Sequence, residues 1–106
     1  MLLILMLLNF SYASDQWKIG QKSLQLTNCP EKYCYYYCPK KDCRALEVFK
    51  NPQKAILTEN GKNPGSEVCT SLKGHVSIAA NNKGDQLSLC RFSDDSILSL
   101  DGLWVW

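Results

Sequence analysis

Six cysteines are the residues of this 106-residue chain with the most definite chemistry. Four lie close together in the first half and two lie further apart in the second half: Cys29, Cys34, Cys38, Cys43, Cys69 and Cys90. Cysteines pair in oxidising compartments, whereas in reducing ones they more often bind zinc. The gaps of four, three and four residues within the first group do not match the short gaps of zinc knuckles. We therefore expect three disulfides and neither a metal nor a cofactor.

The four N-terminal cysteines are arranged symmetrically about Tyr36. A hairpin folded at this residue would place Cys29 opposite Cys43 and Cys34 opposite Cys38. We expect these nested pairs, although four cysteines allow two other pairings.

Other side chains that could support catalysis are few. His75 is the only histidine, and Asp94 and Asp95 are adjacent carboxylates between two apolar runs. Neighbouring carboxylates on a turn diverge into solvent, so a paired acid and base is not expected. The chain also has no nucleophile elbow, phosphate loop or metalloprotease motif. These observations predict a protein that is not an enzyme.

Tyrosine and basic side chains are concentrated around the first four cysteines. Residues 14–62 carry nine Lys or Arg against five Asp or Glu, whereas residues 63–106 carry three against five. The residues that we expect to form a binding surface are Tyr35, Tyr36, Tyr37, Lys40, Lys41 and Arg44. Exposed tyrosines beside cations suit an acidic protein, a glycan or an anionic membrane surface. The alternative is that the tyrosines cover a small disulfide core. The charge excess is too small to predict nucleic-acid binding.

Residues 1–13 contain no charged side chain and begin with an unbroken apolar run, Met1 to Leu8. Ser11 and Ala13 place small residues where a signal peptidase requires them. The run is shorter than the roughly 20 apolar residues needed to span a bilayer, so no transmembrane anchor is expected. We expect a signal peptide over residues 1–13 and a secreted or periplasmic mature protein.

The second half of the chain shows the signals of one helix followed by three strands. Asn63 and Pro64 suit a helix start, and Gly74 suits a left-handed stop. Residues 76–80 and 86–92 alternate as a hairpin, and residues 97–100 form a third apolar run. The expected fold is therefore α+β, with one helix packed on an antiparallel sheet over residues 63–106.

A disulfide between Cys69 on this helix and Cys90 on the second strand would hold the helix against the sheet. If Cys90 faces the helix, Leu87 and Leu89 lie on the opposite face of the strand. That face needs apolar cover, from the first half of the chain or from Trp104 and Trp106.

The motifs of this second half resemble those of a known family. They are Asn63-Pro64-x-Ser66-x-x-Cys69, Gly74, Gly84-x-Gln86, Cys90-x-Phe92-x-Asp94-x-Ser96 and Leu103-Trp104. Over residues 63–104 the chain resembles the bacterial domain of unknown function 333, a family labelled as haemolysins. The resemblance implies a small exported bacterial protein. The chain departs from the family where Lys73, Ser88 and Asp95 stand at positions that usually hold glycine.

The first half, residues 14–62, is expected to be a Cys-rich hairpin segment outside this resemblance. Ala45–Phe49 and Ala55–Thr58 predict a further hairpin. Residues 14–106 are few enough to form one domain. The expected function is an exported, disulfide-rich binding or inhibitor-like protein, and the alternative is a membrane-active haemolysin.

Overall fold

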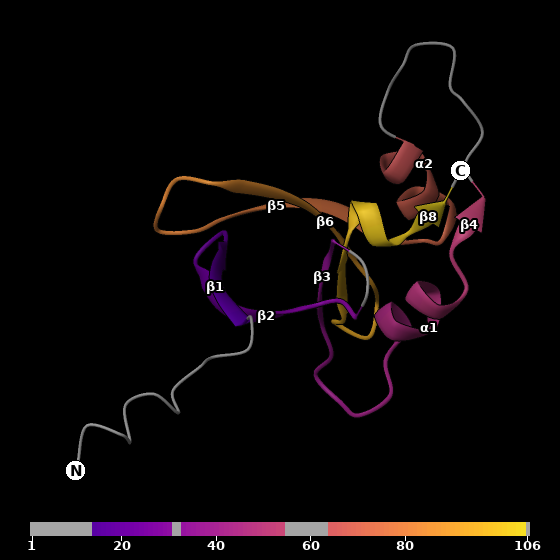
Figure 1. Ribbon diagram of the computed structural model, residues 1–106, viewed down its shortest axis with the longest axis horizontal. Coiled ribbons are helices and arrows are strands. Elements are labelled where there is room, and N and C mark those ends of the chain that lie inside the picture. The colour runs from indigo at the N-terminus through magenta and orange to yellow at the C-terminus, as the bar shows by residue number, and fades with distance from the viewer. Residues whose placement is uncertain (1–13, 31–32, 55–63, 106) are drawn as a thin grey trace.

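Six strands form a closed antiparallel barrel in the computed structural model, which describes residues 14–30, 33–54 and 64–105 (Figure 1). In chain order the barrel strands are β1 (Ser14–Ile19), β2 (Lys22–Asn28), β3 (Tyr35–Tyr37), β5 (His75–Ala80), β6 (Gln86–Arg91) and β7 (Ile97–Ser99). Around the barrel the order is β1-β2-β3-β7-β6-β5. A single residue pair, Lys18 with Ala80, closes the ring between β1 and β5. The barrel is therefore weakly joined at this seam.

The β1–β2 hairpin supplies much of the barrel interior. Trp17 and Ile19 alternate with polar residues on β1, and Leu24 and Leu26 do so on β2. Gly20, with φ of 63°, provides the tight turn between the strands. The buried residues of the barrel interior are Trp17, Leu26, Ala79, Leu89 and Ile97.

The remaining elements gather at the opposite end of the molecule from the free end of the β5–β6 hairpin (Figure 1). They are α1 (Arg44–Lys50), α2 (Pro64–Ser71), the 3-10 helix η2 (Leu100–Gly102) and the parallel pair of β4 (Gln53–Lys54) with β8 (Trp104–Val105). A second buried cluster lies here, and it contains five of the six cysteines together with Phe92, Leu98, Leu100 and Leu103.

The expected fold of one helix on an antiparallel sheet, preceded by a separate Cys-rich hairpin segment, is wrong. The first half of the chain contributes three of the six barrel strands, and β3 joins the two halves because Tyr36 pairs with Leu98 and Tyr37 with Ile97. The inner face of β6 required apolar cover, and Trp17 and Leu26 provide it. The molecule is mostly sheet, with two short α-helices outside the barrel.

Several elements of the second half agree with expectation. The helix begins at Pro64, the hairpin forms as β5 and β6, and the third apolar run forms β7. The left-handed residue after the helix is Lys73, with φ of 65°, and not Gly74. Gly74 is required for a different reason, because a Cβ there would overlap the Cys90 Sγ and lie 3.0 Å from the Cys69 Sγ. Its missing side chain lets the backbone approach the disulfide.

The disulfide between Cys69 and Cys90 is confirmed. The nested pairing of the other four cysteines is wrong, because the bonds join Cys29 to Cys34 and Cys38 to Cys43. The prediction placed the hairpin turn at Tyr36, but Tyr36 lies within β3.

β2 ends at Asn28 and β3 begins at Tyr35, so the chain reverses direction before it reaches Tyr36. The backbone N–H of Cys29 donates to the Cys34 carbonyl at 2.8 Å, which brings these two cysteines together. Cys38 and Cys43 then flank the connection from β3 to α1.

Residues 44–50 form α1 and not the strand expected for Ala45–Phe49. Ala45 and Val48 are both buried, and their spacing of three residues places them on one face of the helix. The expected strand at Ala55–Thr58 and the expected signal peptide lie outside the described residues. No helix in the described part of the chain is long and apolar enough to cross a membrane.

Candidate functional site

The open end of the barrel contains a cavity of about 520 Å³. The cavity begins next to the pair of Lys18 with Ala80, where β1 and β5 separate. Trp17 follows this pair on the β1 side, and Asn81 follows it on the β5 side. The residues that line the cavity are Gln16, Trp17, Tyr33, Tyr35, Asn81, Asn82, Lys83, Asp85, Gln86 and Leu87. We call this hollow the mouth cavity.

Aromatic rings form one wall of the mouth cavity. Trp17 is only 5% exposed, and its ring lies 5.8 Å from the Tyr35 ring, centroid to centroid, at 59°. The backbone N–H of Tyr35 donates to the buried Ser99 hydroxyl at 2.9 Å, which anchors this wall to β7. Tyr33, at the rim, is 91% exposed.

The indole Nε1 of Trp17 is buried and has no hydrogen-bond acceptor among the described residues. A buried donor without an acceptor costs about 1–3 kcal/mol. This buried indole N–H is therefore an unfavourable feature of the barrel interior.

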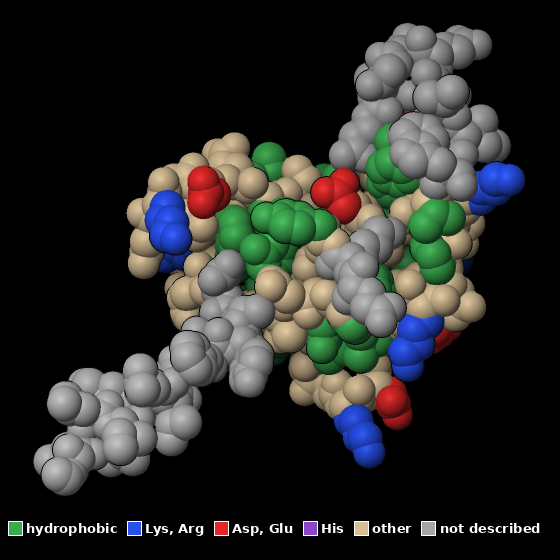
Figure 2. Space-filling view, in the orientation of Figure 1, with side chains coloured by type: hydrophobic (Ala, Val, Ile, Leu, Met, Phe, Trp, Pro, Cys, Tyr) green, Lys and Arg blue, Asp and Glu red, His purple; other side chains and the backbone are tan. Residues whose placement is uncertain are grey.

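The turn from β5 to β6 forms the opposite rim. The Asn81 Oδ1 accepts hydrogen bonds from the backbone N–H groups of Lys83 and Asp85, both at 2.9 Å, and its Nδ2 donates to the Asp85 carboxylate at 3.1 Å. These bonds fix the shape of the turn. Figure 2 shows hydrophobic side chains exposed between the β5–β6 arm and β1, with basic and acidic side chains near the end of the arm.

The three consecutive tyrosines do not share one exposed face. Tyr35 and Tyr37 pack against the barrel interior, whereas Tyr36 packs against the disulfide-rich cluster on the other side of β3. All three are half-buried. Only Tyr35 lines the mouth cavity. These three tyrosines therefore cover buried clusters, as in the alternative to an exposed binding surface.

The basic residues of the expected binding surface lie elsewhere. Lys41 and Arg44 line a second hollow of about 610 Å³ beside α1, and Lys40 is exposed nearby in sequence. Acidic side chains line the same hollow, and the Arg44 guanidinium pairs with Glu47 at 3.0 Å. The residues of the expected surface therefore lie at two separate sites. At the hollow beside α1, acidic side chains balance the positive charge of Lys41 and Arg44.

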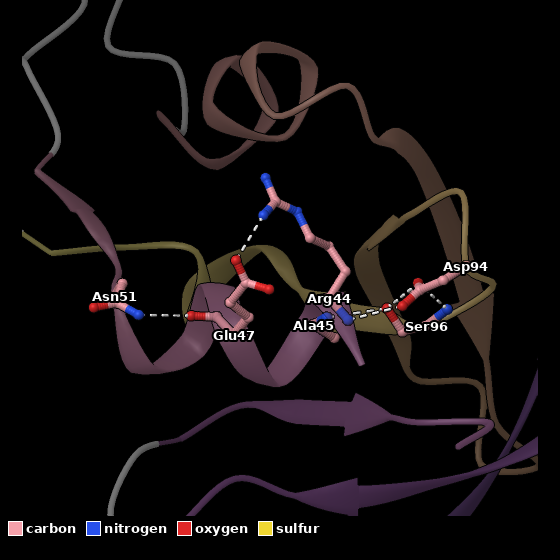
Figure 3. A network of polar contacts seen from close by, with 6 residues as sticks. All are labelled: Arg44, Ala45, Glu47, Asn51, Asp94 and Ser96. Atoms are coloured by element: carbon pink, nitrogen blue, oxygen red, sulfur yellow. Dashed lines mark hydrogen bonds and ion pairs between the residues drawn. The ribbon is translucent and has the colours of Figure 1, made fainter. Parts of the chain in front are cut away.

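Asp94 belongs to a network that holds the start of α1 (Figure 3). Its carboxylate accepts hydrogen bonds from the Arg44 N–H at 2.8 Å and from the Ser96 hydroxyl at 2.6 Å. The Ser96 Oγ in turn accepts from the buried Ala45 N–H at 3.0 Å. Cys43, at the N-cap position, gives no side-chain cap of its own. The turn after β6 thus caps a helix about fifty residues earlier in the chain.

The same network lowers the pKa of Asp94. Partial desolvation by itself would raise the pKa, but the hydrogen bonds from the Ser96 hydroxyl and from the Arg44 and Ser96 N–H groups outweigh it. The Asp94 carboxylate therefore stabilises the start of α1. Asp95, at the adjacent position, forms an ion pair with Arg91 at 3.3 Å.

Sequence reasoning missed most of the mouth cavity. A signal was present in the alternation of Trp17 and Ile19 with Leu24 and Leu26 around Gly20, which is typical of a hairpin. No short sequence pattern indicates that this hairpin lies beside the turn between β5 and β6. Among the described residues, no group of three His, Cys, Asp or Glu side chains could hold a metal ion.

Comparison of the chain with protein-family models, with curated proteins and with solved structures found no match.

Proposed function

We propose that this chain is an exported, disulfide-rich binding protein and that the mouth cavity is its binding site. The observation that carries the proposal is the cavity itself. Its volume of about 520 Å³ lies within the range of roughly 300–1,000 Å³ that is typical of ligand sites. Packed aromatic rings beside amide side chains are also typical of such sites.

The three disulfides support the exported part of the proposal, because stable disulfides are typical of oxidising compartments. Residues 1–13 would act as the signal peptide, and the mature protein would be secreted or periplasmic. The resemblance to domain of unknown function 333 agrees with this location.

Binding rather than catalysis is supported by the residues of the mouth cavity. The two charged side chains among the described residues of its lining, Lys83 and Asp85, belong to a surface turn whose geometry Asn81 sets. Asp94 and Ser96 lie outside the mouth cavity, and both accept hydrogen bonds from backbone N–H groups at the start of α1.

The test uses the exported protein immobilised on a sensor surface, with protein, peptide and oligosaccharide panels as probes. A triple variant, Gln16→Ala/Tyr33→Ala/Gln86→Ala, changes only exposed side chains of the cavity and should fold normally. We expect saturable binding that the triple variant loses. The matched control, Lys40→Ala/Lys41→Ala/Lys50→Ala, changes exposed side chains near α1 and should bind normally. Loss of binding in the control alone would assign the site to the hollow beside α1 instead.

The second candidate function is membrane lysis. The observation that favours it is the outer face of β5, where Val76 and Ile78 are 44% and 59% exposed. Dye release from phosphatidylglycerol vesicles at micromolar protein tests this function. Leakage that Val76→Ser/Ile78→Ser abolishes would support lysis, and intact vesicles would exclude it.

A further inference from the structure

We infer that the ligand of the mouth cavity is a neutral oligosaccharide. This inference rests on the proposed function, because it assigns a ligand class to the same cavity. Three features of the lining support it: its charge, its hydrogen-bonding groups and its aromatic wall.

The charge of the lining favours an uncharged ligand. Among the described residues, the lining contains one cationic side chain, Lys83, and one carboxylate, Asp85. Both lie on the same short turn, and the Asp85 carboxylate also accepts a hydrogen bond from Asn81. A phosphate or a polyanion would meet this carboxylate together with the Lys83 amine. The described part of the lining therefore carries no net charge that would select an ion.

The hydrogen-bonding groups match hydroxyls. Gln16, Asn82 and Gln86 line the cavity and are exposed, and each amide offers both donors and an acceptor. A sugar hydroxyl is likewise a donor and an acceptor, so each amide can form two bonds with neighbouring hydroxyls. An apolar ligand would leave these amides without partners at a cost in binding free energy.

The aromatic wall provides a surface for the C–H face of a sugar ring. Tyr33 is almost fully exposed at the rim, and Tyr35 lies deeper beside Trp17. Aromatic rings combine an apolar face with a polar edge, which suits a ligand that is apolar on its ring face and polar around its rim.

The experiment titrates the ¹⁵N-labelled exported protein with neutral tetrasaccharides: cellotetraose, maltotetraose and the tetramer of N-acetylglucosamine. A heparin tetrasaccharide serves as the charged comparison of equal length, and a hexapeptide of alternating Ser and Ala serves as a polar ligand without sugar rings. We expect at least one neutral sugar to shift the indole N–H resonance of Trp17 and the side-chain amide resonances of Gln16 and Gln86. A Trp17→Phe variant identifies the indole resonance.

Tyr33 gives the sharpest test of stacking. Because its side chain is almost fully exposed, its substitution should change ligand binding without changing the stability of the fold. We expect Tyr33→Ala to weaken sugar binding about tenfold and Tyr33→Phe, which keeps the ring, to change it less than about threefold. Equal losses in the two variants would show that the hydroxyl and not the ring face binds, and would overturn the stacking arrangement.

The possible failures can be told apart. If no neutral tetrasaccharide shifts the cavity resonances at millimolar concentration, the oligosaccharide inference is wrong. If the heparin tetrasaccharide or the hexapeptide shifts them instead, the cavity remains a binding site and only the ligand class is wrong. If sugars shift only resonances around Lys41, Arg44 and Lys50, both the site and the ligand assignment are wrong.

Discussion

The cap of α1 by a distant turn leads to a quantitative prediction for Ser96→Ala. Ser96 is fully buried, and its Oγ accepts from the buried Ala45 N–H at 3.0 Å while its O–H donates to Asp94 at 2.6 Å. Removal of the hydroxyl leaves the Ala45 N–H buried without an acceptor, which costs about 1–3 kcal/mol. Loss of a helix cap typically costs about 0.5–2 kcal/mol, so the two estimates for this one change overlap at about 1–2 kcal/mol.

This loss is large for a small domain, whose total stability is about 5–15 kcal/mol. Each kcal/mol shifts Tm by about 4–8 °C in domains of 60–100 residues, so a loss of about 1–2 kcal/mol should lower Tm by about 4–16 °C. Guanidinium unfolding with the disulfides intact, followed by tryptophan fluorescence, measures the change in free energy of unfolding. Ser93→Ala is the matched control because Ser93 is exposed in the same turn, and its effect should stay below about 0.5 kcal/mol.

A double-mutant cycle with Asp94→Asn tests whether the two residues act together. Because Asp94 and Ser96 are hydrogen-bonded, their effects should depart from additivity by about 0.5 kcal/mol or more. An effect of Ser96→Ala equal to that of Ser93→Ala would show that the turn does not stabilise α1. Full additivity in the cycle would show that Asp94 and Ser96 stabilise the helix independently.

Three further predictions concern the same scaffold. Because the pKa of Asp94 is lowered on folding, its contribution to stability is present above about pH 4 and is lost as the pH falls below this value; Asp94→Asn should flatten the acid side of the stability curve measured by urea unfolding. Lys73→Gly should stabilise the protein by about 0.5–1 kcal/mol because it relieves a left-handed residue, whereas Lys73→Ala keeps the strain and should give no gain in thermal unfolding. Gly74→Ala should destabilise the protein by about 1–3 kcal/mol, because its Cβ would overlap the Cys90 Sγ. In a Cys69→Ala/Cys90→Ala background the cost of Gly74→Ala should shrink, and an unchanged cost in chemical denaturation would contradict the proposed overlap.

The sequence predicted those elements whose signals lie within a few residues. The start of α2 at Pro64 and the hairpin of β5 and β6 follow from a capping preference and from alternation, and both are local properties of the chain. The bond expected between Cys69 on this helix and Cys90 on this hairpin is present. Alternation also located β5, but it did not show that Ala79 would face inward while Val76 and Ile78 face outward. The large side chains of the neighbouring strands, above all Trp17 and Leu89, occupy the narrow interior beside small Ala79.

Long-range pairing accounts for the predictions that failed. The symmetry of four cysteines suggested a turn at Tyr36, but the pairing of β3 with both β2 and β7 makes Tyr36 part of a strand, and the chain reverses before β3 begins at Tyr35. Residues 44–50 carry apolar side chains that suit a strand or a helix. Ser96 and Asp94 stabilise the helix from the other half of the chain.

By itself, the sequence determined the disulfide-rich character of this protein and the hairpin and helix that carry Cys69 and Cys90, because composition and local periodicity are sufficient for these. Only the tertiary structure decided that the first half of the chain completes a barrel. It also decided that Tyr35 and Trp17 meet at the barrel mouth while Lys41 and Arg44 lie beside α1. Strand partners far apart in the chain are selected by the interior that they can fill together, and no short stretch of sequence records that choice.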